Sequence, residues 1–302
     1  MVQGTAQRTA IYRGYDRAGL DAQYNNRGLV PDFAKYFERW KTASATARAQ
    51  VKGALLDASY GPSGPEKLDI FPAAAKPGGK PPLLAFLHGG YWRALDKGDF
   101  SYPAQAYANS GITYVSINYG LTPSVTLDEL IRQACAAVEW LYRNPQAHGS
   151  DVNRLYVSGH SAGGHLAPLI MTADWAAKGL PSDVVKGAVA ISGLYDLEPI
   201  RLNYLSEGMN LDEASVRRNS PIHALPPSSR KCGPLILSVG ADESPEFRRQ
   251  QADYAAAWSE TQQAPVIVDA PGRNHFSIVD AFAEPGHALF RATRDLMVNG
   301  HV

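Results

Sequence analysis

Ser161 has the surroundings of a catalytic nucleophile, because it lies in the run Gly159-His-Ser-Ala-Gly163. This run matches G-x-S-x-G, in which a serine occupies a tight turn between a strand and a helix. Glycines flank such a turn because side chains there would collide with neighbouring strands. The apolar run Leu155–Ser158 precedes it and small and apolar residues follow it. The sequence therefore predicts a hydroxyl that attacks a carbonyl carbon. A glycine-rich turn with a structural serine is the alternative.

A second glycine-containing run, His88-Gly-Gly-Tyr-Trp92, directly follows the apolar run Leu83–Leu87. Attack on a carbonyl turns its oxygen into an anion, which preorganised backbone amides stabilise. We expect three amides to do this, two of them in this loop and one at a helix start, where the dipole favours negative charge. The predicted oxyanion hole consists of Gly89, which allows the bend, and the amide donors Gly90, Tyr91 and Ala162. For His88 itself, a structural role in bracing the loop is favoured over catalysis.

His275 is predicted to be the base that takes the proton from Ser161. It lies in the polar run Pro271–Ser277, right after a strand expected at Val266–Val268. Loops at the carboxyl ends of strands form the ligand-binding edge of an open α/β sheet, so this loop can face Ser161. The other histidines that follow Ser161 fit less well: His165 and His287 are placed in helices, His223 in an irregular segment and His301 at the terminus.

The carboxylate that orients His275 is expected after the strand Leu235–Val239. Two adjacent residues there are candidates, Asp242 and Glu243. Neighbouring side chains point in different directions, so only one can hold the imidazole, fix its tautomer and stabilise its protonated form. The residue types alone do not separate the two.

The elements that position these residues alternate between strand and helix from about residue 50. Alternation of this kind predicts an α/β fold with a mostly parallel central sheet and helices on both faces. Strands are expected at Lys67–Phe71, Leu83–Leu87, Thr113–Asn118, Leu155–Ser158, Gly187–Ile191, Leu235–Val239 and Val266–Val268. Helices are expected at about Val125–Tyr142, Gly163–Lys178, Pro245–Thr261 and Gly286–Val298.

Two segments, residues 1–50 and 195–228, interrupt the alternation. The first is mostly helical and aromatic in pattern, and the second is irregular and ends in a proline-rich run. We expect both to lie over the carboxyl end of the sheet as a small helical cap, because ligands bind at that end. The 302 residues are therefore interpreted as a single domain spanning 1–302 that includes this cap.

The overall composition limits the kinds of partner molecule that we expect. Lys plus Arg and Asp plus Glu are both 29, so the formal net charge is zero and nothing indicates binding to nucleic acid. No apolar run suits a signal peptide or a membrane span, so a cytoplasmic protein is expected. The two cysteines are interpreted as buried thiols. Serine chemistry needs neither a metal nor an organic cofactor, and a homodimer is one possible assembly.

These motifs resemble the kynurenine formamidase (arylformamidase) group of α/β-hydrolases, relatives of the hormone-sensitive-lipase-like carboxylesterases. The resemblance rests on the runs His88–Trp92, Gly159–His165, Ser244–Gln250 and Asn274–Phe276 and spans nearly the whole chain. It implies an α/β-hydrolase fold. It also implies Glu243 as the triad acid, because the acid of that group directly precedes a Ser-Pro-Glu-Phe-like run. Asp242 is kept as the alternative, since that group often has aspartate at the position of Glu243.

The expected activity is hydrolysis of small carboxylic esters or N-formyl aryl amides through an acyl-enzyme. Aromatic residues near the site favour aromatic substrates. The predicted substrate-binding side chains are Trp92, Tyr119 and Phe276. No clustered arginines mark a phosphate or polycarboxylate pocket. The alternative function is a non-catalytic protein that binds a small ligand on a hydrolase scaffold; it is disfavoured because serine, histidine and an acid are all present.

Overall fold

The computed structural model describes residues 9–74 and 79–301, and these form an eight-stranded sheet with the order β1-β2-β4-β3-β5-β6-β7-β8. Neighbouring strands from β4 to β8 are parallel, while β2 is antiparallel to both β1 and β4. The strands are β1 (Leu55–Ser59), β2 (Lys67–Phe71), β3 (Leu83–Leu87), β4 (Thr113–Ile117), β5 (Leu155–His160), β6 (Ala188–Ile191), β7 (Leu235–Ser238) and β8 (Val266–Ile267). The expected mostly parallel α/β sheet is therefore confirmed.

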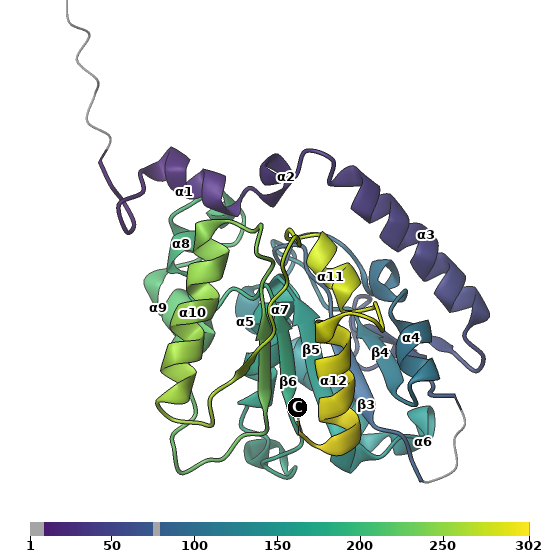
Figure 1. Ribbon diagram of the computed structural model, residues 1–302. Helices are drawn as coiled ribbons and strands as arrows, with labels where there is room; N and C mark the ends of the chain where they lie inside the picture. Colours follow the sequence, from purple (N-terminus) through teal and green to yellow (C-terminus); the bar gives the residue numbers. More distant parts are fainter. Residues whose placement is uncertain (1–8, 75–78, 302) are drawn as a thin grey trace, which may run out of the picture.

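Helices cover both faces of the sheet (Figure 1). Residues of β3 alternate between two apolar cores: Leu83, Ala85 and Leu87 pack with α5, α7 and α10, whereas Leu84 and Phe86 pack with α3, α4, α11 and α12. Strand β3 is buried on both faces, which explains why its run is apolar throughout. The helices are α1 (Arg17–Tyr24), α2 (Asn26–Leu29), α3 (Ala34–Gln50), α4 (Ala104–Asn109), α5 (Leu127–Arg143), α6 (Pro145–His148), α7 (Ala162–Met171), α8 (Glu198–Arg201), α9 (Glu213–Asn219), α10 (Pro245–Ser259), α11 (Ser277–Ala281) and α12 (Ala288–Asn299).

Several elements differ from expectation. The short helices α4, α6, α8, α9 and α11 were not predicted. The edge strand β1 was not expected, because most of its side chains are exposed and its sequence lacks an apolar run. Helix α7 ends at Met171, whereas the sequence pattern predicted it to continue to Lys178. Beyond Met171 the chain folds back, so that the Trp175 indole donates to the carbonyl oxygen of Ile170 at 3.1 Å. This contact satisfies a carbonyl of the last turn and ends the helix.

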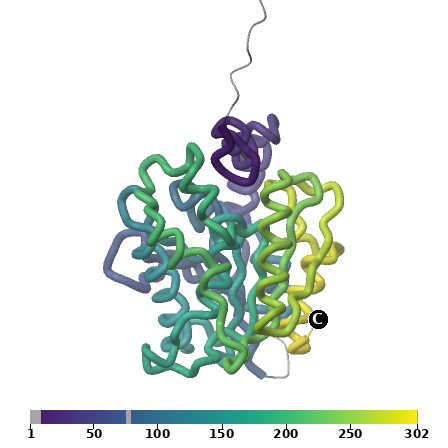
Figure 2. Tube along the Cα trace, turned by 90° about the vertical axis from the view of Figure 1, so that its left-hand side faces the viewer, coloured from purple at the N-terminus to yellow at the C-terminus, as the bar shows by residue number. Residues whose placement is uncertain are grey.

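The described N-terminal residues, from 9 to 50, run across the end of the sheet at which β5 and α7 meet (Figures 1 and 2). Three contacts hold the segment to distant parts of the chain. The Tyr12 hydroxyl donates to Asp196 at 2.8 Å, the Trp40 indole donates to Asp280 at 2.8 Å, and Arg48 pairs with the buried Asp69 at 2.8 Å. The segment is therefore fixed near its start at Tyr12 and along its last helix at Trp40 and Arg48.

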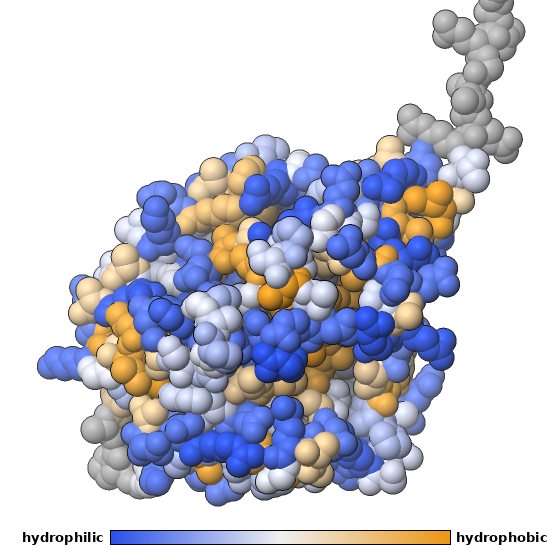
Figure 3. All heavy atoms as spheres, turned by 180° about the vertical axis from the view of Figure 1, so that it is seen from behind, coloured by the Kyte–Doolittle hydropathy of each residue, from blue (hydrophilic) through white to orange (hydrophobic). Residues whose placement is uncertain are grey.

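The surface seen from behind is mostly hydrophilic, with apolar groups scattered among polar ones (Figure 3). Within the described residues, no helix has both the length and the apolar character needed to cross a bilayer. Both cysteines are free thiols; Cys135 is buried, as expected, but Cys232 is only partly buried. Residues 1–8 of the expected cap lie outside the described part of the chain.

Candidate active site

Ser161 occupies a strained turn between β5 and α7. Its φ of 56° and ψ of −113° lie outside the ordinary regions for a side-chain-bearing residue. The turn is held because the Ser161 amide donates to the carbonyl oxygen of Ile191 in β6 at 2.8 Å. A Cβ on Gly163 would lie 1.9 Å from the carbonyl oxygen of Leu87, and one on Gly159 would lie 2.2 Å from that of Gly163. Both glycines are therefore required sterically, and for Gly163 the clash is with strand β3.

Ser161 and His275 are within hydrogen-bonding distance, although they are 114 positions apart in the sequence. The Ser161 hydroxyl donates to Nε2 of His275 at 3.0 Å. Nδ1 of His275 donates to Oε2 of Glu243 at 2.7 Å. All three side chains are buried, with exposed fractions of 2%, 5% and 6% for Ser161, His275 and Glu243. The loops after β5, β7 and β8 thus bring a hydroxyl, an imidazole and a carboxylate into one line.

Glu243, and not Asp242, contacts the imidazole. Its second oxygen, Oε1, accepts from the Ser192 hydroxyl at 2.5 Å and from the Gly240 amide at 2.8 Å. These donors favour the ionised carboxylate and fix its orientation. Asp242 is exposed to solvent and lies outside this network.

The loop after β3 lies against the Ser161 turn. A Cβ on Gly89 would lie 3.2 Å from Cβ of Ser161, so this glycine permits close approach of the two loops. The bend itself is at Gly90, whose φ is +110°, and the sequence-based assignment of the bend to Gly89 was wrong. Within the described residues, the amides of Gly90, Tyr91 and Ala162 donate to no protein acceptor. They are therefore available to an oxygen atom of a ligand.

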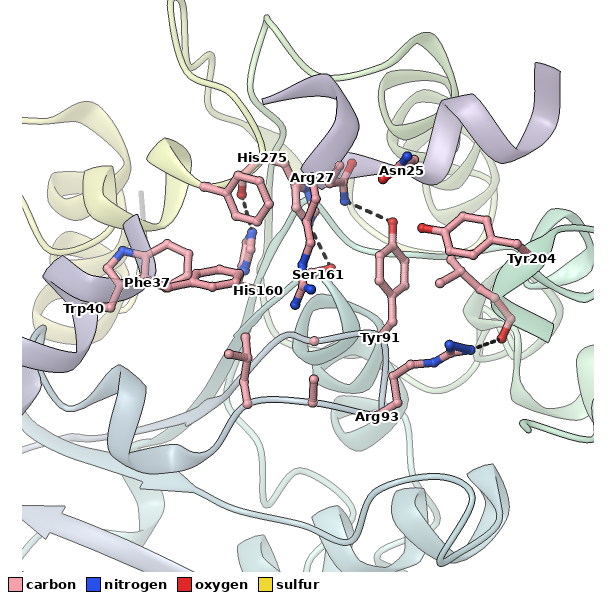
Figure 4. Close-up of a pocket in the computed structure, with 16 residues that line it drawn as sticks. Asn25, Arg27, Phe37, Trp40, Tyr91, Arg93, His160, Ser161, Tyr204 and His275 are labelled. Atoms are coloured by element: carbon pink, nitrogen blue, oxygen red, sulfur yellow. Dashed lines mark hydrogen bonds between the residues drawn. The ribbon is translucent and has the colours of Figure 1, made fainter. Parts of the chain in front are cut away.

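A pocket of about 380 Å³ opens above Ser161 and His275 (Figure 4). One wall is the loop from Gly90 to Leu95, and another comes from the N-terminal segment through residues 25–27, Phe37 and Trp40. Tyr204 and Leu205, from the second irregular segment, complete it. Both segments expected to form a cap therefore border the pocket.

Of the three aromatic residues predicted to bind substrate, only Phe276 lines this pocket. Trp92 and Tyr119 are fully buried elsewhere, so their assignment was wrong. Positive φ angles at Tyr91 and Trp92 turn the loop so that Trp92 enters the core, where its indole donates to Nδ1 of His165 at 3.2 Å. Tyr119 stacks on His88 with ring centroids 4.3 Å apart and donates to the carbonyl oxygen of His88 at 2.6 Å. Trp92 and Tyr119 therefore pack in the core beneath the loop that follows β3 and hold it in place.

Three histidines near the site are buried, and burial lowers the pKa of each. His88 is fully buried under the loop. His165 accepts from Trp92 at Nδ1, and its Nε2 donates to the carbonyl oxygen of Asn219 at 2.7 Å, so it is a neutral tautomer with a pKa lowered to about 4. The pKa of His160 is well below 6.5 because of burial and the nearby His275. His160 and His165 form hydrogen bonds with different partners and not with each other.

Sequence reasoning missed most of the pocket wall. His160 was given no role beyond its place in the serine turn, yet it lines the pocket. Arg27, Phe37, Trp40 and Tyr204 also line it, and no local motif marks them. The one available signal was the aromatic character of the first 50 residues.

A hydroxyl aligned with an imidazole and a carboxylate, beside unpaired backbone amides, is suited to attack on a carbonyl carbon. Together with the parallel sheet and the strand–serine–helix turn, this arrangement defines a hydrolase of the α/β-hydrolase class. The chain is 31% identical over 287 residues to the kynurenine formamidase of Salmo salar, covering 93% of this chain and 95% of that one. The kynurenine formamidase of Danio rerio is 33% identical over 82% of this chain and 83% of its own. The chain therefore belongs to the kynurenine formamidase family.

Other comparisons agree with this fold. The BD-FAE family model matches residues 68–200, which include most of β2, all of β3 to β6 and the Ser161 turn. A solved structure from Silicibacter sp. TM1040 is 28% identical with a TM-score of 0.78, covering 90% of this chain and 97% of that chain. The esterase of Pyrobaculum calidifontis has a TM-score of 0.66 at 18% identity over 91% of this chain and 96% of its own, which shows a shared fold.

Proposed function

We propose that this hydrolase cleaves small N-formyl aryl amides, with small carboxylic esters as secondary substrates. The observation that carries the proposal is the hydrogen-bonded relay from Ser161 through His275 to Glu243. Ser161 and His275 line a pocket that aromatic side chains border. A volume of about 380 Å³ accommodates one aryl group with a short acyl group. Similarity to kynurenine formamidases supports the formyl group as the acyl part.

In the proposed mechanism Ser161 is the nucleophile. Its oxygen forms a bond to the formyl carbon while its proton passes to Nε2 of His275. The carbonyl oxygen becomes an anion, and the amides of Gly90, Tyr91 and Ala162 donate to it. Glu243 stabilises the imidazolium that forms.

The tetrahedral intermediate then breaks its bond to nitrogen. His275 returns the proton to that nitrogen, so the aryl amine leaves neutral and a formyl ester remains on Ser161. Water then attacks the formyl carbon while His275 takes its proton; the bond to the Ser161 oxygen breaks, and His275 returns that proton to Ser161. Formic acid is released and ionises to formate in water. The proposed steps use only these side chains, the backbone amides and water.

The two segments that border the pocket are proposed to act as a cap. Phe37 and Trp40 from α3 supply apolar surface against which a flat ring can pack, as does Phe276. Tyr91 donates to the carbonyl oxygen of Tyr24 at 2.7 Å, which joins the predicted oxyanion loop to the N-terminal segment. The cap would thus position the leaving group relative to His275 and limit access of water.

The test compares kcat/KM for N-formylkynurenine with kcat/KM for p-nitrophenyl acetate and p-nitrophenyl octanoate. We expect the formyl amide to be cleaved at least as efficiently as the acetate, although an activated ester is chemically more reactive. The octanoate should be slower than the acetate by about tenfold or more, because a pocket of about 380 Å³ leaves little room for a long acyl chain beside the aryl group. Preference for the octanoate, with no cleavage of the formyl amide, would contradict the proposal.

A further inference from the structure

The described wall of the pocket above Ser161 includes positively charged side chains but no carboxylate. Two arginines, Arg27 and Arg93, are among the described residues that line it, and no aspartate or glutamate is among them. The two are 66 positions apart in the sequence, which is why the linear pattern gave no sign of them. Arg93 is already engaged: its Nη2 donates to the carbonyl oxygen of Leu205 at 2.6 Å and to that of Glu207 at 3.0 Å.

Arg27 has no such polar partner. Across residues 9–74 and 79–301, its guanidinium takes part in no hydrogen bond and no ion pair, and it is exposed at the pocket. The group lies over two aromatic rings, 5.3 Å from the centroid of Phe33 and 5.5 Å from that of Phe37. Stacking of this kind uses the face of the guanidinium and leaves the donors on its edge free. Its side chain points from α2 into the pocket (Figure 4).

The ring contacts of Arg27 indicate on which side of the scissile amide bond its guanidinium lies. Phe37 packs edge-on against Phe276, with ring centroids 5.5 Å apart, and Phe276 is the neighbour of His275 in the sequence. In the proposed mechanism the leaving group receives its proton from His275, so the leaving group lies on this side of the pocket. Arg27 therefore lies on the side of the pocket where the aryl leaving group would accept this proton.

We infer that Arg27 is a specificity-determining residue that binds a carboxylate on the aryl leaving group. A planar guanidinium donates two parallel hydrogen bonds to a carboxylate, and its seat on Phe33 and Phe37 reduces the entropy lost on binding. Arg27 would thus distinguish, among formyl aryl amides, those that carry a carboxylate remote from the scissile bond from those that do not. This inference rests on the proposed function and adds to it the charge of the substrate.

The experiment uses two ligands that differ only in this charge, N-formylkynurenine and its carboxamide, in which a neutral amide replaces the carboxylate. kcat and KM are measured for both with the wild-type chain, Arg27→Met and Arg27→Lys. Kd for both is also measured by calorimetry on the Ser161→Ala chain, with and without Arg27→Met. Arg217→Met is the matched control, because Arg217 is also exposed and, within the described residues, unpaired, but lies on α9 away from the pocket.

We expect Arg27→Met to raise KM and Kd for the carboxylate ligand by about tenfold or more, and to change those for the carboxamide by less than about threefold. Arg27→Lys should recover part of the loss, and Arg217→Met should behave as wild type. Equal binding of both ligands to the unsubstituted chain, or equal weakening of both by Arg27→Met, would overturn the inference. Absence of turnover in the wild-type chain would instead refute the proposed function, and the Kd values would still decide the role of Arg27.

Discussion

The ring of His160 packs against the ring of His275, with centroids 4.7 Å apart, and its Nε2 donates to the carbonyl oxygen of His275 at 2.8 Å. His160 precedes Ser161 in the sequence, so it joins the serine turn directly to the backbone of the histidine loop. Because the pKa of His160 is well below 6.5, the ring stays neutral at physiological pH and adds no charge beside His275. The pair therefore sets the separation between Ser161 and His275.

Replacing this donor should misplace the base. His160→Phe keeps an aromatic ring but cannot donate to the His275 carbonyl. We expect kcat to fall about tenfold while KM changes less than about threefold, because the substrate pocket persists and the alignment of reacting groups is lost. Steady-state kinetics and a melting curve on the same preparation would check this. An unchanged kcat in a folded variant would show that the backbone holds His275 without His160.

Ser161→Ala should lower kcat by about 10⁴-fold or more, because the residual rate comes only from binding and the oxyanion amides. A fluorophosphonate probe should label the wild-type chain and leave the variant unlabelled. A loss below about tenfold, or labelling that persists in the variant, would assign the nucleophile to another residue.

The two adjacent carboxylates offer a matched pair. Glu243→Gln should lower kcat by about 10²- to 10⁴-fold, because an amide can stabilise the wrong imidazole tautomer and carries no charge for the imidazolium. Asp242→Asn should leave kcat within about threefold, since Asp242 is exposed and does not contact His275. Equal effects of the two substitutions on kcat would remove the distinction.

Stability should depend on pH through the buried histidines. The pKa of His165 is about 4 in the folded chain, compared with an ordinary value of 6.5, because the ring is buried. Between these values the unfolded chain binds a proton that the folded chain excludes, so the free energy of unfolding decreases as pH falls. For His165 alone the decrease from about pH 7 to about pH 5 is about 2 kcal/mol, and the lowered pKa values of His88 and His160 act in the same direction.

Urea unfolding at the two pH values measures this dependence. His165→Gln should be less stable at about pH 7, because Trp92 and Asn219 lose their partner, but its stability should change less with pH than that of the wild type. A variant with the same pH dependence as the wild type would assign the effect to other groups.

The sequence was sufficient for features that depend on neighbouring residues. Mostly apolar runs predict β3 and β5, because a strand buried on both faces has no side exposed to solvent. The Ser161 turn is predictable because sterics restrict its flanking positions to glycine. His275 could be assigned because it lies in a loop directly after β8. In each case a short stretch of chain contains the physical reason for its structure.

Features that depend on contacts between distant segments could not be predicted. Nothing near Trp92 indicates that left-handed backbone turns its indole into the core, so an aromatic residue beside two glycines was assigned to the pocket. Arg27 and Phe37 reach the pocket only because the N-terminal segment crosses the sheet and is anchored through Trp40 and Arg48. Such placement follows from tertiary contacts and leaves no local pattern.

The residues proposed to break the bond and those proposed to bind the leaving group come from different stretches of the chain. Ser161, Glu243 and His275 all follow strands of the sheet, whereas Arg27, Phe37 and Trp40 come from helices that precede the first strand. Grafting residues 9–50 from a relative onto this scaffold should therefore transfer the choice of leaving group while the proposed acyl-transfer steps stay the same. Exchange of this one helical segment would then change substrate selectivity without altering Ser161, Glu243 or His275.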